Sequence, residues 1–207
     1  MRKAAAIKHG YTSGARSLAT RSVSGLARTR VTPNALTALG VLLCAAAALT
    51  VPFEYRDQEL CYWLGAGLFV AGSVLDILDG ALARAGGKST PFGAFLDSTT
   101  DRVSEGFMLA AIAFVFARNA RDVFVVVTVA AVAGSFLVSY TRARAEALGL
   151  RGDVGIGSRA ERVVVITAGL VLAPWGVLPW AIVLLTVTAW VTVVQRVLSV
   201  RSQLLAR

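Results

Sequence analysis

Beyond residue 31 the chain consists mainly of long apolar runs separated by short polar stretches. The runs cover roughly residues 32–53, 61–84, 93–117, 123–147, 160–173 and 180–200. A helix needs about 20 predominantly apolar residues to cross the hydrocarbon core of a bilayer, and most runs approach that length. Thr32 can cap the first helix, and Pro33 is tolerated in its first turn. The pattern predicts an all-α integral membrane protein with six transmembrane helices.

Residues 1–31 form a separate segment in which basic residues are scattered among Ala, Ser, Thr, Leu and Val, without any acidic residue. This composition predicts an amphipathic juxtamembrane helix that lies on an anionic membrane surface. We therefore divide the chain into a cytoplasmic basic helix, 1–31, and a six-helix membrane domain, 32–207. Membrane lipids are the expected partners of the basic segment, and nothing in it indicates binding of a nucleic acid.

Composition agrees with a membrane location, because 56% of the residues are apolar and only 16% are charged. A soluble domain of this size is excluded at that composition. The net charge of +9 is unevenly distributed, since 18 of the 21 basic residues fall on one side of the six expected spans. The positive-inside rule then predicts a cell-membrane protein with both termini and the two longer loops in the cytoplasm.

Acidic residues inside membrane spans are costly and mark function. The second and third expected spans carry five of them, namely Glu105 and the two pairs Asp76/Asp79 and Asp97/Asp101. Residues three or four apart share one face of a helix, and a short loop makes the two spans antiparallel neighbours, so both pairs converge near the cytoplasmic end. Oxygen-only ligands favour hard divalent cations. We therefore expect a site for two Mg²⁺ ions, with Mn²⁺ as an alternative, that clamps a diphosphate.

Two other interpretations of these carboxylates are open. They can be structural partners of Arg84, Lys88 and Arg102, and Glu105 can be a structural partner of Arg102 or support the metal ligands from behind. They can also line the pathway of a divalent-cation transporter or channel. A transporter predicts acidic residues at several depths or a broken helix at the midplane, whereas these lie at one end of apolar spans.

The stretch Asp76-Ile-Leu-Asp79-Gly80-Ala-Leu-Ala83-Arg84, followed by Gly93-Ala-Phe-Leu-Asp97-Ser-Thr-Thr-Asp101, resembles the signature of the CDP-alcohol phosphotransferase family at every defined position. The resemblance implies a six-helix membrane enzyme, usually a homodimer. Members transfer a phosphatidyl-type group from a CDP-linked lipid to an alcohol and release CMP. The donor expected here is CDP-diacylglycerol.

The resemblance also implies roles for individual residues. Asp76, Asp79 and Asp97 are expected to be metal ligands, and Asp101 is expected to be both a ligand and the general base for the acceptor hydroxyl. Gly80 leaves room for a flat nucleotide, and Arg84, four residues on, can reach a diphosphate bound over it. The expected CDP-lipid-binding residues are Thr32, Pro33, Asn34, Ala35, Gly80, Ala83, Arg84, Thr90 and Gly93.

Arginines concentrate at the cytoplasmic ends of the last three expected spans and suit a dianionic phosphate, which guanidinium groups bind bidentately. The acceptor alcohol is therefore expected to carry a phosphate. The candidates for binding it are Arg142, Arg159, Arg162 and Arg196. The glycine-rich stretch 152–157 follows no strand, so it does not predict a dinucleotide site and is expected to be a mobile loop over the cavity.

The run Ser-Tyr-Thr-Arg-Ala-Arg-Ala-Glu at 139–146, the Arg-Ala-Glu-Arg at 159–162 and the Gln-Arg pair at 195–196 resemble the bacterial phosphatidylinositol-phosphate synthases. That resemblance implies inositol 1-phosphate as the acceptor. Arg142 stands where the resemblance leads us to expect lysine, which keeps the charge and changes the hydrogen-bond geometry. Glycerol 3-phosphate is the alternative acceptor, and an archaeal-type CDP-lipid is the alternative donor.

Overall fold

The computed structural model describes residues 32–87 and 90–206, and its regular structure is entirely helical. The basic segment 1–31 lies outside the described residues, so the expected juxtamembrane helix stays a prediction. The elements are α2 (Pro33–Thr50), the 3₁₀ turn η1 (Val51–Phe53), α3 (Gln58–Ala85), α4 (Pro91–Arg118), α5 (Asp122–Ala147), α6 (Arg159–Val171), the 3₁₀ turn η2 (Ala173–Trp175) and α7 (Leu178–Leu205).

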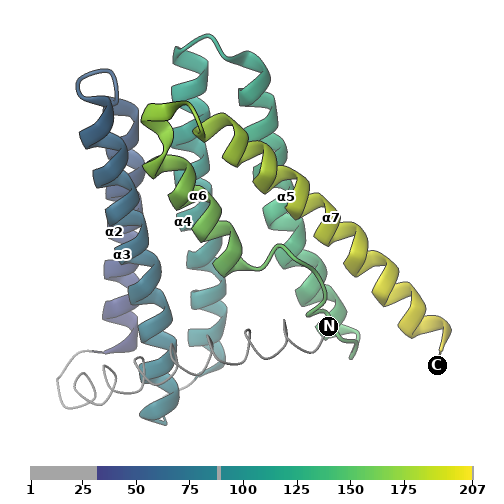
Figure 1. The fold of residues 1–207 in the computed structure, drawn as a ribbon. Helices are drawn as coiled ribbons and strands as arrows, with labels where there is room; N and C mark the ends of the chain where they lie inside the picture. Colours follow the sequence, from purple (N-terminus) through teal and green to yellow (C-terminus); the bar gives the residue numbers. More distant parts are fainter. Residues whose placement is uncertain (1–31, 88–89, 207) are drawn as a thin grey trace, which may run out of the picture.

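The helices run alternately up and down in one bundle (Figure 1). The end of α3, the beginning of α4 and the α5–α6 connection lie at one end, and the α2–α3, α4–α5 and α6–α7 connections lie at the other. The helix α7 is tilted, and its C-terminal part diverges from the bundle. The beginning of α2, the end of α3 and the beginning of α4 therefore share the end at which the aspartates were expected to meet.

The helices α2 to α7 follow the six apolar runs with ends displaced by at most a few residues, apart from the longer end of α7. Four described helical segments are long and apolar enough to cross a membrane, namely Pro33–Phe53, Gln58–Arg84, Asp122–Ala147 and Leu178–Leu205. The helix α4 carries acidic and basic side chains in its first half, and α6 has only 13 residues.

The helices α2 and α3 pack closely because small residues face each other. A β-carbon added to Gly72 would lie 2.6 Å from both the Sγ of Cys44 and the carbonyl oxygen of Gly40. One added to Gly65 would lie 2.6 Å from a Val51 methyl group. Gly65 and Gly72 therefore permit the close packing of α3 against α2.

The interior of the bundle is apolar, with Met108, Ile112, Ile166 and Ile182 fully buried between α4, α6 and α7. On α5, by contrast, Val123 and Val126 are about 70% exposed, at 72% and 68%. An interior and an exterior that are both apolar are typical of helices surrounded by lipid, because the bilayer removes the need for a polar outer face.

The loop 148–158 between α5 and α6 is held against α7. The Nε of Arg196 donates to the carbonyl oxygen of Val154 at 2.8 Å, and the side-chain amide of Gln203 contacts both the N–H and the carbonyl of Arg151 at 2.9 and 3.0 Å. A β-carbon on Gly155 would lie 2.3 Å from a Thr192 methyl group. The loop was expected to be mobile, but these contacts hold it against α7.

Candidate functional site

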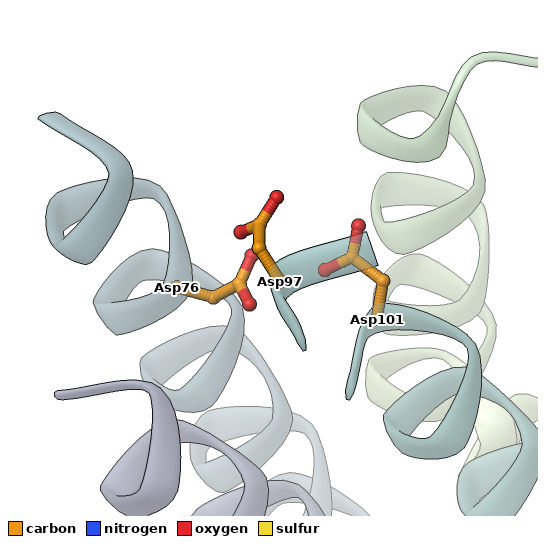
Figure 2. Close-up of side chains that lie close together, drawn as sticks. All are labelled: Asp76, Asp97 and Asp101. Carbon is orange, nitrogen blue, oxygen red and sulfur yellow. The ribbon is translucent and has the colours of Figure 1, made fainter. Parts of the chain in front are cut away.

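Three aspartates converge between α3 and α4. Asp76 comes from α3, and Asp97 and Asp101 come from successive turns of α4 (Figure 2). One carboxylate oxygen from each lies within 4.8 Å of the others. Asp76 is buried, at 7% exposure, and Asp97 and Asp101 are half-buried. The spacing of four residues on α4 places its two carboxylates on the same face, as the sequence predicts.

Asp79 is turned toward α2 and does not belong to this group of three. It is buried, at 3% exposure, and one of its carboxylate oxygens accepts a hydrogen bond from the hydroxyl of Thr37. Thr37 was not among the residues expected at the site. Its position one helical turn after Pro33, on the same helix as the Thr32–Asn34 segment, is the only signal in the sequence that could have indicated it.

The three clustered carboxylates suit a divalent metal ion. Their donors are oxygens only, which hard cations such as Mg²⁺ and Mn²⁺ prefer. Three anionic groups in a partly buried space also need a compensating positive charge. Asp76, Asp97 and Asp101 are therefore the residues that could hold a metal ion, and Asp79 lies one turn away on α3.

Arg159, the first residue of α6, supplies positive charge to this cluster. Its guanidinium forms an ion pair with Asp76, and its Nη2 lies 2.6 Å from the Oδ1 of Asp101. The arginine thereby connects the beginning of α6 to both α3 and α4. Arg102 is a weaker neighbour, with its Nη1 3.9 Å from the Oδ2 of Asp101.

A cavity of about 370 Å³ opens beside Asp79 and Asp97. A β-carbon on Gly80 would lie 3.2 Å from the Nη1 of Arg84, so the guanidinium lies directly over the glycine. Thr90 caps α4, because its hydroxyl accepts a hydrogen bond from the N–H of Gly93 at 3.0 Å. The residues lining the cavity include eight of the nine expected to bind the CDP-lipid, Thr32, Pro33, Asn34, Gly80, Ala83, Arg84, Thr90 and Gly93. Ala35 is not among them.

A larger cavity, of about 1070 Å³, lies between α4 and α5. Asp97 and Asp101 line it at one side, and Ser139 and Arg142 line it at the other. Ala94 and Asp97 line both cavities, so the two cavities are adjacent at this turn of α4. Arg102 also lines the larger cavity, although it was expected only as a structural partner of acidic residues.

The four arginines expected at an acceptor phosphate occupy different surroundings. Arg142 is exposed at the larger cavity, and its Nε donates to Glu146 at 2.9 Å. Arg159 contacts the aspartates. Arg196 is buried, and it donates to the carbonyl oxygens of Val138 and Val154.

Arg162 is also buried and forms a bidentate ion pair with Glu105, at 2.7 and 2.9 Å. The suggested pairing of Glu105 with Arg102 is therefore wrong. Arg102 lies three residues before Glu105 on the same helix, whereas Arg162 enters from α6 and satisfies both carboxylate oxygens. The sequence identifies Glu105, Arg102 and Arg162 as charged residues, but it does not show which of the two arginines faces Glu105.

Comparison with known proteins agrees with this arrangement. Residues 30–195 match the family described as CDP-alcohol phosphatidyltransferase. The phosphatidylinositol phosphate synthase of Mycobacterium tuberculosis is 38% identical over 181 residues, covering 83% of this chain and 80% of that protein. The archaetidylinositol phosphate synthase of Pyrococcus horikoshii is 38% identical over 181 residues, covering 86% and 88%.

Solved structures of the M. tuberculosis phosphatidylinositol phosphate synthase are similar in fold. The structure with CDP-DAG bound has a TM-score of 0.78 and 35% identity, and the match covers 89% of this chain and 94% of that one. The structure in complex with manganese and citrate has a TM-score of 0.78 and 36% identity, covering 88% of each.

Proposed function

Because this chain belongs to the CDP-alcohol phosphatidyltransferase family, we propose that it transfers the phosphatidyl group of CDP-diacylglycerol to inositol 1-phosphate and releases CMP. The observation that carries the proposal is that Asp97 lines both cavities, while Asp101 lines the larger one. A donor bound in the smaller cavity and an acceptor bound in the larger one would therefore both lie beside the carboxylate cluster.

The smaller cavity suits the CDP part of the donor. Gly80 gives a flat surface on α3, and the guanidinium of Arg84 above it can pair with a phosphate oxygen. The beginnings of α2 and α4 line this cavity, and the helix dipole favours anions at a helix start. The solved relative that binds CDP-DAG supports the donor class.

The larger cavity suits the phosphorylated acceptor. Arg142 lines it directly, and Arg159 reaches Asp101 at its edge. A guanidinium has five N–H donors, so Arg159 can contact a phosphate while it remains near the aspartates. Arg162 and Arg196 have buried protein partners, and their role in this account is to hold the neighbouring segments in place.

Asp101 accepts the proton of the acceptor hydroxyl as that oxygen attacks the phosphorus attached to the diacylglycerol. The bond from this phosphorus to the oxygen of CMP breaks, and CMP leaves with the electron pair. Asp76, Asp97 and Asp101, with Asp79 beside them, would hold two divalent ions, Mg²⁺ or Mn²⁺, which supply positive charge to the diphosphate. The manganese complex of a solved relative supports a divalent metal.

Six helices, α2 to α7, cross the cell membrane in this account, with both termini and the catalytic site on the cytoplasmic side. The distribution of basic residues supports that orientation. On α4, Asp97, Asp101 and Arg102 line the larger cavity and Glu105 is paired with Arg162, which offsets the cost of these charges within a membrane span. We also propose, from its basic composition, that the segment 1–31 lies on the anionic leaflet as an amphipathic helix, and, from the family resemblance, that the enzyme is a homodimer.

The acceptor assignment is tested by measuring CMP release from CDP-diacylglycerol with inositol 1-phosphate, glycerol 3-phosphate, free inositol and serine in parallel. We expect inositol 1-phosphate to have the highest kcat/KM. The kcat/KM for free inositol should be lower by about 10²-fold or more, because free inositol has no phosphate for the arginines to bind. Equal rates with free inositol would contradict a phosphate pocket. Preference for glycerol 3-phosphate would replace the proposed acceptor with the alternative.

The Pyrococcus relative, an archaetidylinositol phosphate synthase, is a specific reason to test a second donor. Repeating the measurement with an archaeal-type CDP-lipid distinguishes the two. A higher kcat/KM with the archaeal-type lipid would mean that the donor carries isoprenoid instead of acyl chains. The proposed chemistry at the site would be unchanged.

Gly80→Val is expected to raise the KM for CDP-diacylglycerol by about tenfold or more, because the side chain would enter the smaller cavity beneath Arg84. The KM for the acceptor should change little. Gly67→Val is the matched control, since it adds the same side chain to the same helix where no atom lies within 4 Å of a β-carbon. Equal effects of the two substitutions on the donor KM would remove Gly80 from the nucleotide site.

A further inference from the structure

A buried ion pair lies one helical turn beyond the carboxylate cluster. Glu105 on α4 and Arg162 on α6 have side chains only 8% and 5% exposed. Two hydrogen bonds of 2.7 and 2.9 Å join them. Charged groups are rarely buried unless they are paired, and removal of one partner leaves the other without compensation. This pair therefore constrains the distance between α4 and α6 next to the site.

Arg162 also holds the backbone that leads into α6. Its Nη1 donates to the carbonyl oxygen of Gly157 at 2.9 Å, while the N–H of Gly157 donates to the hydroxyl of Thr192 at 2.8 Å. A β-carbon on Gly157 would lie 2.8 Å from that hydroxyl, so a larger residue does not fit there. The N–H of Ser158 donates to Glu161 at 2.6 Å. The beginning of α6 is thus fastened to α4 through Glu105 and to α7 through Thr192.

These contacts determine the position of Arg159. It is the first residue of α6 and lies three positions before Arg162, on the same face of the helix. From there its guanidinium reaches Asp76 on α3 and Asp101 on α4. The Arg159 side chain can contact both carboxylates only if the first turn of α6 stays at a fixed distance from α3 and α4.

We propose that Glu105 and Arg162 are positioning residues, which hold Arg159 across Asp76 and Asp101 by fixing the first turn of α6 against α4. The role rests on the proposed function in one respect, namely that Arg159 contacts the phosphate of the acceptor. The placement of Arg159 itself can be measured without any substrate, because Arg159 and a divalent cation compete for the same carboxylates.

The first measurement is Mn²⁺ binding by calorimetry to the purified full chain in detergent. Arg159→Ala removes the guanidinium that competes with Mn²⁺ for the carboxylates, and it is expected to lower the Kd for Mn²⁺ by roughly tenfold. Glu105→Gln is expected to lower it as well, because Arg159 is no longer held at the carboxylates. Glu105→Gln added to Arg159→Ala should change the Kd by less than about twofold, since the residue through which it acts is already gone.

The control is Glu54→Gln at the opposite end of the bundle. Glu54 is buried at 8% exposure and is paired with Arg118, and it also accepts a hydrogen bond from Asn119 at 3.0 Å. Its loss removes a similar pair far from the aspartates, so the Kd for Mn²⁺ should stay within about twofold of the parent value. If Glu105→Gln does not fold, Arg162→Lys is tested instead. Lysine keeps the positive charge but lacks the guanidinium that contacts Glu105 and Gly157 at the same time.

The second measurement is steady-state CMP release. Glu105→Gln is expected to raise the KM for the acceptor by about tenfold while the KM for CDP-diacylglycerol stays within about twofold. Tighter Mn²⁺ binding together with weaker acceptor binding is a combination that a general loss of stability does not produce.

The proposal is overturned if Glu105→Gln leaves the Kd for Mn²⁺ unchanged, as Glu54→Gln does, or if its effect multiplies with that of Arg159→Ala. If the parent enzyme releases no CMP with any acceptor, the proposed function fails. The Mn²⁺ titrations then still decide whether Glu105 and Arg162 position Arg159.

Discussion

Asp101→Asn is expected to lower the rate of CMP release by about 10³- to 10⁴-fold, the upper range for loss of a general base. Asparagine has the same shape as aspartate but accepts no proton from the acceptor hydroxyl and no longer offers an anionic ligand. Binding of CDP-diacylglycerol should be retained, because the smaller cavity is lined by other residues. The measurement compares single-turnover CMP release with equilibrium binding of the CDP-lipid.

The matched control for this variant is Asp122→Asn, an exposed aspartate in the first turn of α5. It makes the same chemical change at the opposite end of the bundle and should leave CMP release within about twofold of the parent. Near-parent activity of Asp101→Asn would remove Asp101 as the base and place the proton transfer on another group.

Removal of divalent metal is expected to have an effect of similar size. Chelation with EDTA should abolish CMP release, and addition of Mg²⁺ or Mn²⁺ should restore it, because the carboxylate cluster would hold the divalent ions proposed to supply positive charge to the diphosphate. In Asp76→Asn the Mn²⁺ concentration needed for half-maximal activity should rise by more than about 100-fold. Loss of a residue that only supports a metal ligand typically costs about 10- to 100-fold in metal affinity, and loss of a ligand should cost more.

Asp153→Asn in the loop 148–158 serves as the control for the metal titration, because this exposed aspartate does not belong to the cluster. Full activity after complete chelation, verified by elemental analysis, would contradict a metal-dependent transfer. An unchanged Mn²⁺ requirement in Asp76→Asn would remove that residue from the ligands.

The helices could be predicted closely from the sequence because their boundaries coincide with changes in polarity. The expected fourth span, 123–147, differs from α5 by one residue, and both Thr32 and Thr90 cap helices that begin with proline. Such local signals depend on a few neighbouring residues and not on the packing of the bundle.

The carboxylate site could be predicted in part. Asp97 and Asp101 are four apart and share a face, so their convergence follows from helix geometry. Asp76 and Asp79 are three apart and differ in direction by about 60° around α3. That difference allows Asp79 to turn toward Thr37 on α2 while Asp76 joins the cluster. The choice depends on how α2 packs against α3, which spacing alone does not reveal.

The arginines could be predicted least, because their roles depend on contacts between helices distant in sequence. The distribution of charge correctly indicated positive groups near the aspartates. It did not distinguish Arg159, which contacts two of them, from Arg162, which is bound by Glu105 and the carbonyl of Gly157. Long side chains reach partners several residues away, so their pairing is determined by helix register and rotation.

The most direct test of the central claim is to identify both products of the purified enzyme by mass spectrometry, with CDP-diacylglycerol, inositol 1-phosphate and Mn²⁺. We predict phosphatidylinositol phosphate and CMP in equal amounts, and neither product above background from Asp101→Asn. CMP formed together with phosphatidic acid instead would indicate attack by water, and it would contradict transfer to an acceptor alcohol at this site.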